Sequence, residues 1–593
     1  MSTHFQSDRY VGATLLDAGH TRFRFWAPSC HTVLLEAQGH APVAMARDRE
    51  GWFECVFPCG AGTRYRYRVA RDLAVPDPAS CCQPDDVRGP SEVVDPAAYD
   101  WRHAAWPGRP WHEVVIYEVH VGLMGGYDGV ARDLPRLAAL GVTAIELMPL
   151  AEVPGGRNWG YDGVLPFAPE SAYGPPDALK ALIDTAHGLG LMVFLDVVYN
   201  HFGPDGNYLA DYATPFFRYD TATPWGAAID FGQEAVSQFF IDNALYWLME
   251  FRFDGLRLDA VQAIVDRDWL LALPAIIRNH VERGRHVHLI VENENNDAGL
   301  LRAGYRAQWN DDAHNALHVL LTGEDEGYYG NFAPDPAPAL ARVLAEGFAF
   351  QGEVQPVNGK ARGSPSADLA PDRFIIFLQN HDQIGNRALG ERLGVLAAPQ
   401  ALRAAYGLVL LCPQIPMLFM GEEWGSRQPF LFFTDYNPAL GRIVREGRRQ
   451  EFAGFSHFAS AEKRDTIPDP NAPETYATSR LDPAERDRPA HREWNAHIAQ
   501  LLALRHAEIT PRLPGARAMG AQVLGRGAVF ARWRMGDGAV LSIALNLADA
   551  AVPLPDMPQG RCLHAVLPHG VDLFCATLPP YAMMACLNEA EDE

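Results

Sequence analysis

Gly255-Leu-Arg-Leu-Asp259, inside the run Glu250-Phe-Arg-Phe-Asp-Gly-Leu-Arg-Leu-Asp-Ala-Val261, predicts a short apolar strand that ends in a carboxylate. Side chains alternate between the two faces of a strand, so Arg257 and Asp259 point the same way. A guanidinium beside a carboxylate keeps the acid ionised, as a nucleophile or a charge stabiliser requires. A structural ion pair at a strand end is the alternative interpretation, so the rest of the chain has to decide between the two.

Three other apolar runs also end in acidic or polar side chains. They are Met192–His201 with Asp196, Asn200 and His201, His288–Glu292 with Glu292, and Phe374–Asp382 with His381 and Asp382. Helix-like segments separate these runs, which predicts parallel strands whose carboxyl ends share one face of the sheet. We therefore expect four acids to converge on one pocket: Asp196, Asp259, Glu292 and Asp382.

Eight strand candidates alternate with helical patterns, which favours an α/β fold that closes into a (β/α)8 TIM barrel. The expected strands begin at Val114, Val142, Met192 and Gly255, and continue at His288, near Tyr305, at Phe374 and at Pro416. Helices are expected at Leu134–Leu140 before Gly141, and at Ala178–Ala186, Ala235–Phe251, Trp269–Val281 and Trp494–Leu504. In such a barrel the chemistry is assembled at the carboxyl ends of the strands.

The chain is predicted to contain three domains. Residues 1–100 predict a carbohydrate-binding-like β-sandwich, because Thr21–Trp26 and Tyr65–Val69 alternate apolar and polar residues. Residues 101–505 predict the catalytic barrel with long loop insertions, and residues 506–593 predict a second β-sandwich. The turn-rich segment from Val75 to Ser91 is expected to be a linker laid across the barrel.

The composition bounds the classes of partner. The chain has 593 residues and a formal net charge of −23, without the clustered basic surface that nucleic acids or anionic membranes need. No signal-peptide pattern and no bilayer-spanning apolar run is found, which favours a cytoplasmic protein. The nine cysteines form neither a Cys-x-x-Cys pair nor a disulfide framework, so we expect them to be reduced and mostly buried.

Two long connections, Asp205–Gln233 and Asp311–Asp372, are expected to wall a cleft at the carboxyl ends of the strands. Aromatic residues in such loops can stack on sugar faces, although each one could instead anchor its loop. The candidates are Trp159, Tyr161, Trp225, Trp309, Tyr328 and Tyr329.

Four motifs together resemble the signature regions of the α-amylase superfamily of glycoside hydrolases. They are Asp196-Val-Val-Tyr-Asn-His201, Gly255–Asp259, Ile290-Val-Glu292 and Gln379-Asn-His-Asp382. Within that superfamily the chain is most similar to the maltooligosyltrehalose trehalohydrolases, over nearly its whole length. The stretches that carry this similarity include Ile116–Gly122, Trp159–Asp162, Trp309–His314, His318–Glu324 and Gly421–Gly425.

The resemblance implies hydrolysis of the α-1,4 bond next to the terminal α,α-trehalose of maltooligosyltrehalose, with retention of configuration. It implies that Asp259 is the nucleophile, Glu292 the general acid and then base, and Asp382 the transition-state stabiliser. Glu292 follows an apolar run without an adjacent cation in the sequence, so its pKa can be raised enough to deliver a proton. The residues expected to bind substrate are Tyr161, His201, Trp225, Arg257, Trp309, Asp311, Asp312 and His381. No cofactor and no metal ion is expected, and the protein is expected to be a monomer or a homodimer.

Several positions depart from the pattern of that family. Gln262 stands where a histidine or lysine often follows the nucleophile, and Val291 stands where alanine usually precedes the acid. Cys81 and Cys82 replace residues that are usually not cysteines. Asn200 holds calcium in many amylases, but without recognisable partner ligands we expect it to hydrogen-bond within its own loop.

Three alternatives stay open at this point. A branching transferase or a plain amylase would use the same catalytic residues and differ only in the loops on the acceptor side. A catalytically silent glycan-binding protein could retain the barrel, although the complete set of acids argues against it. A metal-dependent barrel enzyme could use the acids as Mg²⁺ ligands.

Overall fold

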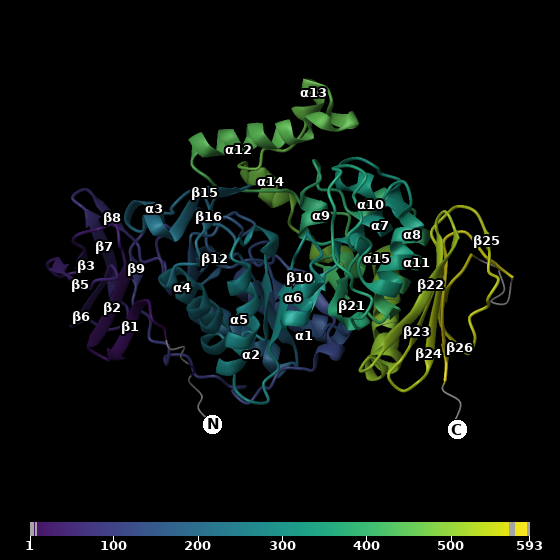
Figure 1. Ribbon diagram of the computed structural model, residues 1–593, viewed down its shortest axis with the longest axis horizontal. Coiled ribbons are helices and arrows are strands. Elements are labelled where there is room, and N and C mark those ends of the chain that lie inside the picture. Colours follow the sequence, from purple (N-terminus) through teal and green to yellow (C-terminus); the bar gives the residue numbers. More distant parts are fainter. Residues whose placement is uncertain (1–4, 6–8, 569–575, 590–593) are drawn as a thin grey trace.

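The computed structural model describes residue 5 and residues 9–568 and 576–589. Figure 1 shows the arrangement: the N-terminal sheets (purple) and the C-terminal sheet (yellow) lie on opposite sides of a central barrel (teal). Helices α12 (Pro438–Glu451) and α13 (Ala461–Arg464) stand above the barrel in this view.

Eight parallel strands in the described part of the chain close the predicted barrel. In order they are β10 (Ile116–Val119), β11 (Ala144–Leu147), β14 (Met192–Val197), β17 (Gly255–Leu258), β18 (His288–Val291), β19 (Ala307–Trp309), β20 (Phe374–Ile376) and β21 (Ile415–Phe419). All of their residues are buried, as parallel strands covered on both faces require. The predicted (β/α)8 fold is therefore confirmed, including the sixth strand near Tyr305.

The register of three neighbouring strands explains why distant acids meet. Arg257 of β17 pairs with Asp196 of β14 on one side and with Ile290 of β18 on the other. Leu258 pairs with Val291, so Asp259 and Glu292 each follow this pair by one residue. Both acids consequently emerge at the same carboxyl edge of the barrel.

The predicted barrel helices are present with somewhat different ends. They are α1 (Gly126–Leu140), α2 (Pro176–Gly188), α4 (Glu234–Leu245), α5 (Arg267–His280) and α15 (Pro489–Leu504), and a further helix, α11 (Pro399–Leu411), was not predicted. Gly141 ends α1 with a left-handed φ of 106°, a conformation that favours glycine. After α4 the chain continues as a π-helical turn, Tyr246–Glu250, so this helix covers most of the predicted range.

Two sheets pack face to face in the N-terminal region. One has the order β1 (Gly12–Asp17), β2 (His20–Trp26), β6 (Trp52–Phe57), β5 (Ala46–Arg47). The other has the order β4 (Val43–Ala44), β3 (Leu34–Ala37), β7 (Arg64–Ala70), β8 (Leu73–Val75), with β9 (Ser91–Glu92) also paired to β7. Rings from both sheets interdigitate in the core, for example Phe25 of β2 (His20–Trp26) stacked on Tyr67 of β7 (Arg64–Ala70). This packing is that of the predicted sandwich.

The segment from Val75 to Ser91 lies against a barrel connection as expected, since Val87 packs on Val164, Leu165 and Ala168, but it joins two strands of one sheet and is not a linker between domains. Val75 ends strand β8 (Leu73–Val75) and Ser91 begins β9 (Ser91–Glu92), so both ends of the segment belong to the second sheet. Between them, Asp77 is buried and accepts hydrogen bonds from the hydroxyls of Tyr65 and Tyr67. These buried contacts fix the segment to the sheet.

The C-terminal region forms a sheet in the order β22 (Arg517–Gly525), β23 (Ala528–Arg534), β24 (Val540–Asn546), β28 (Ala582–Asn588), β26 (Arg561–Val566). Its β23 (Ala528–Arg534) and β24 (Val540–Asn546) are predicted strands, and its face packs on α8 (Pro336–Glu346) and α11. The small ribbon of β25 (Val552–Pro553) and β27 (Thr577–Leu578) covers the opposite face through Leu554 and Leu578. The division of the chain at residues 100 and 505 stays a prediction.

The two connections expected to wall the cleft are more structured than predicted. The first contains the hairpin of β15 (Phe217–Thr223) and β16 (Gly226–Ile229). The second begins with α7 (Asp311–Thr322) and includes α8 (Pro336–Glu346), which places part of it against the C-terminal sheet. The start of the second connection is therefore a buried helix, α7, and not an exposed loop.

Other expectations concern membranes and cysteines. No helix in the described residues is both long and apolar enough to cross a membrane. The eight described cysteines are free thiols, and five of them are buried. Arg9 donates a hydrogen bond to the buried Cys81, and Cys575 lies outside the described residues.

Candidate active site

Arg257 lies at the centre of the site, fully buried in β17. Its Nη1 donates to both carboxylate oxygens of Asp196, at 2.9 and 2.7 Å, and to Oδ1 of Asp259 at 2.8 Å. Its Nη2 lies 2.9 Å from Oε2 of Glu292. One guanidinium therefore contacts three of the four acids that the sequence placed at strand ends.

Glu292 has no cation beside it in the sequence, but the fold places Arg257 against it. The sequence places these residues 35 positions apart, but the parallel register of β17 and β18 brings them together. Burial raises the pKa of Glu292 above its ordinary value, although Arg257 opposes this shift. The predicted direction of the pKa change is therefore found in spite of the guanidinium.

Asp259 receives a second donor that the sequence did not reveal. Nδ2 of Asn200 donates to Oδ2 of Asp259 at 2.7 Å and to its backbone carbonyl at 2.9 Å. Asn200 bonds within its own loop as expected, and it reaches Asp259 as well because the end of β14 lies directly beside the end of β17. Asn200 also contacts His201 through its Oδ1. In the sequence, only the position of Asn200 beside His201, in the motif after the third strand, pointed to a place for Asn200 in the active site.

The backbone after Asp259 turns toward Glu292. Ala260 adopts a left-handed conformation with φ 38°, which is uncommon for a residue with a Cβ. Its N–H donates to Oε2 of Glu292 at 2.9 Å. Strained backbone of this kind occurs at functional sites, where the surrounding structure holds it in place.

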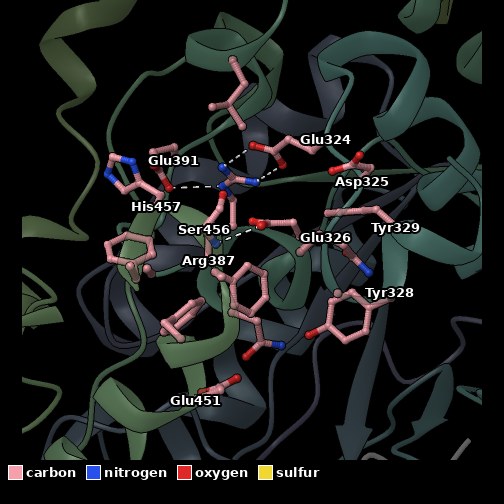
Figure 2. Close-up of a pocket in the computed structure, with 18 of the residues that line it drawn as sticks. Glu324, Asp325, Glu326, Tyr328, Tyr329, Arg387, Glu391, Glu451, Ser456 and His457 are labelled. Atoms are coloured by element: carbon pink, nitrogen blue, oxygen red, sulfur yellow. Dashed lines mark hydrogen bonds and ion pairs between the residues drawn. The ribbon is translucent and has the colours of Figure 1, made fainter. Parts of the chain in front are cut away.

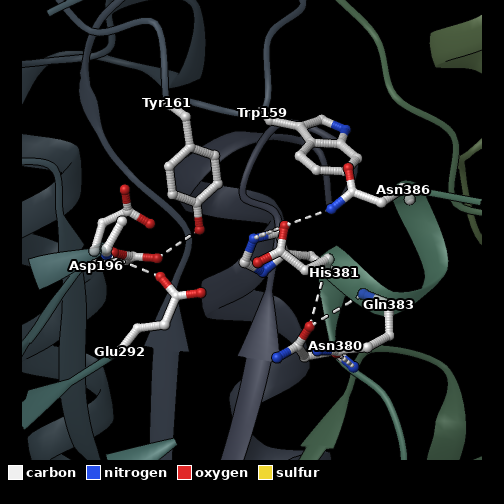
Figure 3. Close-up of polar contacts among 12 residues, drawn as sticks. Trp159, Tyr161, Asp196, Glu292, Asn380, His381, Gln383 and Asn386 are labelled. Carbon is white, nitrogen blue, oxygen red and sulfur yellow. Dashed lines mark hydrogen bonds and ion pairs between the residues drawn. The ribbon is translucent and has the colours of Figure 1, made fainter. Parts of the chain in front are cut away.

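Tyr161 and His381 form one wall of the site, as Figure 3 shows. Their rings stack with centroids 5.1 Å apart, and the Tyr161 hydroxyl donates to Oδ2 of Asp196 at 2.6 Å. Asp382 follows His381 at the start of α9 (His381–Gly385), where Asn380 caps the helix. Nδ2 of Asn386 donates to Oδ1 of Asp382 at 3.2 Å, which orients the carboxylate.

His201 and Trp225 lie side by side. The two rings stack with centroids 4.7 Å apart at an interplanar angle of 12°. His201 is 8% exposed and its Nε2 contacts the backbone carbonyl of Tyr161 at 2.9 Å, whereas Trp225 is 48% exposed between β15 and β16. The exposed face of Trp225 is therefore open to a ligand.

Two predicted substrate-binding residues are placed differently from the expectation. Trp309 lies in β19 and not in a loop, is 1% exposed, and packs its indole against the Arg257 guanidinium at 4.0 Å. Asp312 is fully buried in α7, where it accepts from Asn296 and from the backbone of Ala349 and lies 2.7 Å from Nη1 of Arg362. These buried partners exclude direct contact between Asp312 and the substrate. Trp309 packs against Arg257 and supports it from within the barrel.

Two adjoining cavities meet at Asp382. The inner cavity, about 490 Å³, is lined by Gln262, Glu292, Asp311, Arg362 and Asp382 among others. The outer cavity, about 530 Å³, is lined by Glu324, Arg387, Glu451, Phe455, His457 and Asp382 among others, and Figure 2 shows it. Tyr328, Tyr329, Gln383 and Asn386 line both cavities.

Asp311 faces the inner cavity, as its prediction requires. Nε2 of Gln383 donates to its Oδ1 at 3.3 Å. Burial, with Glu292 nearby, raises the pKa of Asp311 to about 8. Gln262 lines the same cavity and accepts from the backbone N–H of Glu294 at 3.3 Å. An amide and a protonated carboxyl can both bond to sugar hydroxyls.

No group of three or more His, Cys, Asp or Glu side chains within the described residues is arranged to hold a metal ion. The absence of a metal from the reaction stays a prediction.

Comparisons with known proteins agree on a family. The family model for the alpha amylase catalytic domain matches residues 100–221, and a domain of unknown function, DUF3459, matches residues 516–583. The malto-oligosyltrehalose trehalohydrolase of Deinococcus radiodurans is 41% identical over 84% of this chain and 83% of its own length. The protein of the same name from a Rhizobium species is 38% identical over 92% of this chain and 94% of its own length.

A solved structure covers almost the whole chain. A crystal structure from Salmonella typhimurium, provisionally named an alpha amylase, superimposes with a TM-score of 0.92 at 42% identity and covers 98% of this chain and 100% of that one. The barrel, the four acids at its carboxyl edge and the full-length relatives lead to one conclusion. The chain belongs to the malto-oligosyltrehalose trehalohydrolase family, glycoside hydrolases of the α-amylase superfamily.

Proposed function

We propose that this enzyme hydrolyses the α-1,4 bond next to the terminal α,α-trehalose of maltooligosyltrehalose and releases free trehalose by a retaining double displacement. Asp259 is the nucleophile, Glu292 the general acid and then base, and Asp382 stabilises the transition state. The single observation that carries this proposal is the Arg257 guanidinium, whose Nη1 contacts Asp259 and whose Nη2 contacts Glu292. A shared guanidinium holds two carboxyls close together, and retaining enzymes need a separation of about 5 to 5.5 Å.

Asp259 is suited to nucleophilic attack because both of its oxygens have a donor. Arg257 donates to Oδ1 and Asn200 donates to Oδ2, and both bonds stabilise the negative charge. The two bonds also fix the orientation of the carboxylate toward the anomeric carbon of the sugar. After attack, the glucan chain is held as an ester on Asp259 until water releases it.

Glu292 is suited to proton transfer. Burial raises its pKa, so a larger fraction of the side chain is protonated near neutral pH than for an exposed glutamate. Oε2 contacts the N–H of Ala260 and lies near Arg257, which leaves Oε1 as the oxygen to carry the proton. In the second step the same carboxylate accepts a proton from the attacking water.

The two cavities suggest where each part of the substrate lies. A general acid must reach the oxygen of the leaving group, and Glu292 lines only the inner cavity. We therefore assign the leaving trehalose to the inner cavity, where Asp311, Gln262 and Arg362 can bond to its hydroxyls. The glucan chain then extends past Asp382 into the outer cavity, where Tyr328 (Figure 2) and Phe455 provide apolar surface for sugar faces.

Asp382, His381, Tyr161 and Arg257 surround the sugar that is attacked. Asp382 is about one third exposed and faces both cavities, so it can bond to sugar hydroxyls as positive charge develops on the ring. Trp225, with His201 behind it, offers an exposed aromatic face at the rim.

Further features of the proposal concern the setting of the enzyme. We propose that it works in the cytoplasm as a monomer or homodimer, without a cofactor, a metal or a nucleic-acid partner. The net charge of −23 supports the lack of a nucleic-acid partner, since phosphate backbones repel acidic surfaces. Sedimentation of the purified chain, with and without added RNA, tests both the oligomeric state and the lack of binding.

A product assay tests the proposed function. Purified enzyme is given maltopentaosyltrehalose in one reaction and a plain maltooligosaccharide of equal length in another. Free trehalose, formed faster than any product from the plain oligosaccharide, is the expected result. Branched glucan, or maltose without trehalose, would instead indicate a branching enzyme or an amylase.

A further inference from the structure

We propose that Glu118 of the first barrel strand is a positioning residue that holds His381 in its charged form, with Nε2 directed at the sugar beside Asp382. The inference rests on the retaining chemistry proposed above and assigns to that chemistry a residue outside the four motifs. It concerns a carboxylate that makes no contact with Asp259 or Glu292 among the hydrogen bonds and ion pairs of the described residues.

Two contacts join Glu118 to His381 from below. Glu118 lies in β10 and is 1% exposed, as is His381. Oε2 of Glu118 accepts from the backbone N–H of His381 at 3.1 Å, and Oε1 lies 2.5 Å from Nδ1 of the ring. Because one carboxylate binds both the backbone and the ring, it fixes the direction in which the opposite ring nitrogen points.

The opposite ring nitrogen, Nε2, lies beside Asp382. Tyr161 stacks on the ring, and Nε2 of His381 has no hydrogen-bond partner within the described residues. Nε2 lies 3.4 Å from Oδ1 of Asp382. A buried donor without a partner is unfavourable, so Nε2 is available to donate to a sugar hydroxyl that enters beside Asp382.

Whether His381 is charged depends on burial and on the charges of its neighbours, which act in opposite directions. Burial opposes a positive charge, but Asp382 and Glu118 outweigh it and raise the pKa to about 9. The other charged or titratable groups that interact with His381, electrostatically or through a ring contact, include His120, Glu146, Tyr161, Asp196, Arg257 and Glu292. A pKa of about 9 means that the charge is present at lower pH and is lost as the pH rises through 9.

The neighbouring strand supplies a matched control. Glu146 of β11 is the register partner of Glu118 and is equally buried, but neither of its carboxyl oxygens has a hydrogen-bond partner within the described residues. Burial, together with Glu118 and Asp196, raises the pKa of Glu146 well above its ordinary value. Replacing Glu146 with glutamine preserves the shape of a buried side chain and removes no hydrogen bond to His381.

The test measures kcat/KM from pH 5 to pH 10 with an α-maltooligosyl fluoride. Fluoride leaves without a proton from Glu292, so ionisation of the general acid does not limit the measured step. The unaltered enzyme should lose activity with an apparent pKa near 9. In Glu118→Gln this loss should move about 1 to 3 pH units lower, as expected when a contacting opposite charge is removed. Glu146→Gln should follow the unaltered enzyme.

A conservative variant guards against a folding defect. Glu118→Asp keeps the charge on a shorter side chain. The apparent pKa at which this variant loses kcat/KM should therefore lie between the values for the unaltered enzyme and for Glu118→Gln. If Glu118→Gln does not fold, the shift in apparent pKa measured for Glu118→Asp alone tests the role of Glu118. An unchanged pH profile in the folded variants overturns the role of Glu118 and leaves the proposed function intact. Failure of the unaltered enzyme to hydrolyse the fluoride would overturn the proposed chemistry and this inference together.

Discussion

Replacement of Arg257 by lysine tests the arrangement of the acids most informatively. The guanidinium uses Nη1 for Asp196 and Asp259 and places Nη2 beside Glu292. A lysine has a single ammonium on a flexible stem and cannot occupy both positions. The variant therefore keeps a positive charge in the barrel but loses at least one charged contact to a catalytic carboxyl.

The expected size of the effect follows from that loss. A hydrogen bond to a charged group contributes about 1.5 to 3 kcal/mol. Since about 1.4 kcal/mol corresponds to a tenfold change in rate, Arg257→Lys should lower kcat/KM for trehalose release roughly 10-fold to 150-fold. Arg257→Met should in addition lower the free energy of unfolding by about 3 to 5 kcal/mol, because it leaves buried carboxylates without a cation.

Arg505 provides the control for this prediction. It is also fully buried, but it donates only to the backbone carbonyls of Leu410, Cys412 and Gln414. Arg505→Lys should lower the melting temperature without a comparable loss of kcat/KM in the folded protein. A kcat/KM within twofold of the unaltered enzyme in Arg257→Lys would refute the view that one guanidinium positions both acids.

The remaining predictions concern individual side chains. Asp259→Asn should abolish turnover while calorimetry still detects binding of maltooligosyltrehalose, and near-normal turnover would remove Asp259 from its role. Glu292→Gln should lose activity on maltooligosyltrehalose but retain the first step with a glycosyl fluoride, and equal losses on both substrates would contradict an acid role. Burial opposes the charge of Glu324, but His318 and Arg387 lower its pKa to about 2. A lowered pKa stabilises the fold above pH 4.5, and this stabilisation is lost as the pH falls toward 2. The melting temperature of Glu324→Gln should therefore fall less than that of the unaltered enzyme between pH 5 and pH 3, and parallel curves would contradict this.

The barrel could be predicted because apolar runs of strand length recur between helical patterns. The runs ending in Asp196, Asp259 and Glu292 all proved to be neighbouring strands. Their ends were less predictable, since β19 has only three residues and gives almost no periodic signal. Helix α7 lies within the long connection Asp311–Asp372, for which a cleft wall but no helix was predicted.

The candidate site was predictable in its acids but not in their partners. Arg257 and Asp259 could be paired because they lie two residues apart on one strand. The contacts of Arg257 with Glu292 and of Asn200 with Asp259 depend on the register between strands, which no local pattern specifies. For the same reason the sequence could not show that Asp312 is enclosed by Arg362 and Asn296.

The central claim is that Asp259 attacks the sugar while Glu292 lies close enough to protonate the leaving group. The most direct measurement is to trap the covalent intermediate with a 5-fluoro-α-glucosyl fluoride in Glu292→Gln and to locate the adduct by peptide mass spectrometry. The adduct should lie on Asp259, in the peptide that contains Gly255-Leu-Arg-Leu-Asp259. An adduct on Asp382 or Asp196, or turnover without any adduct, would contradict the account.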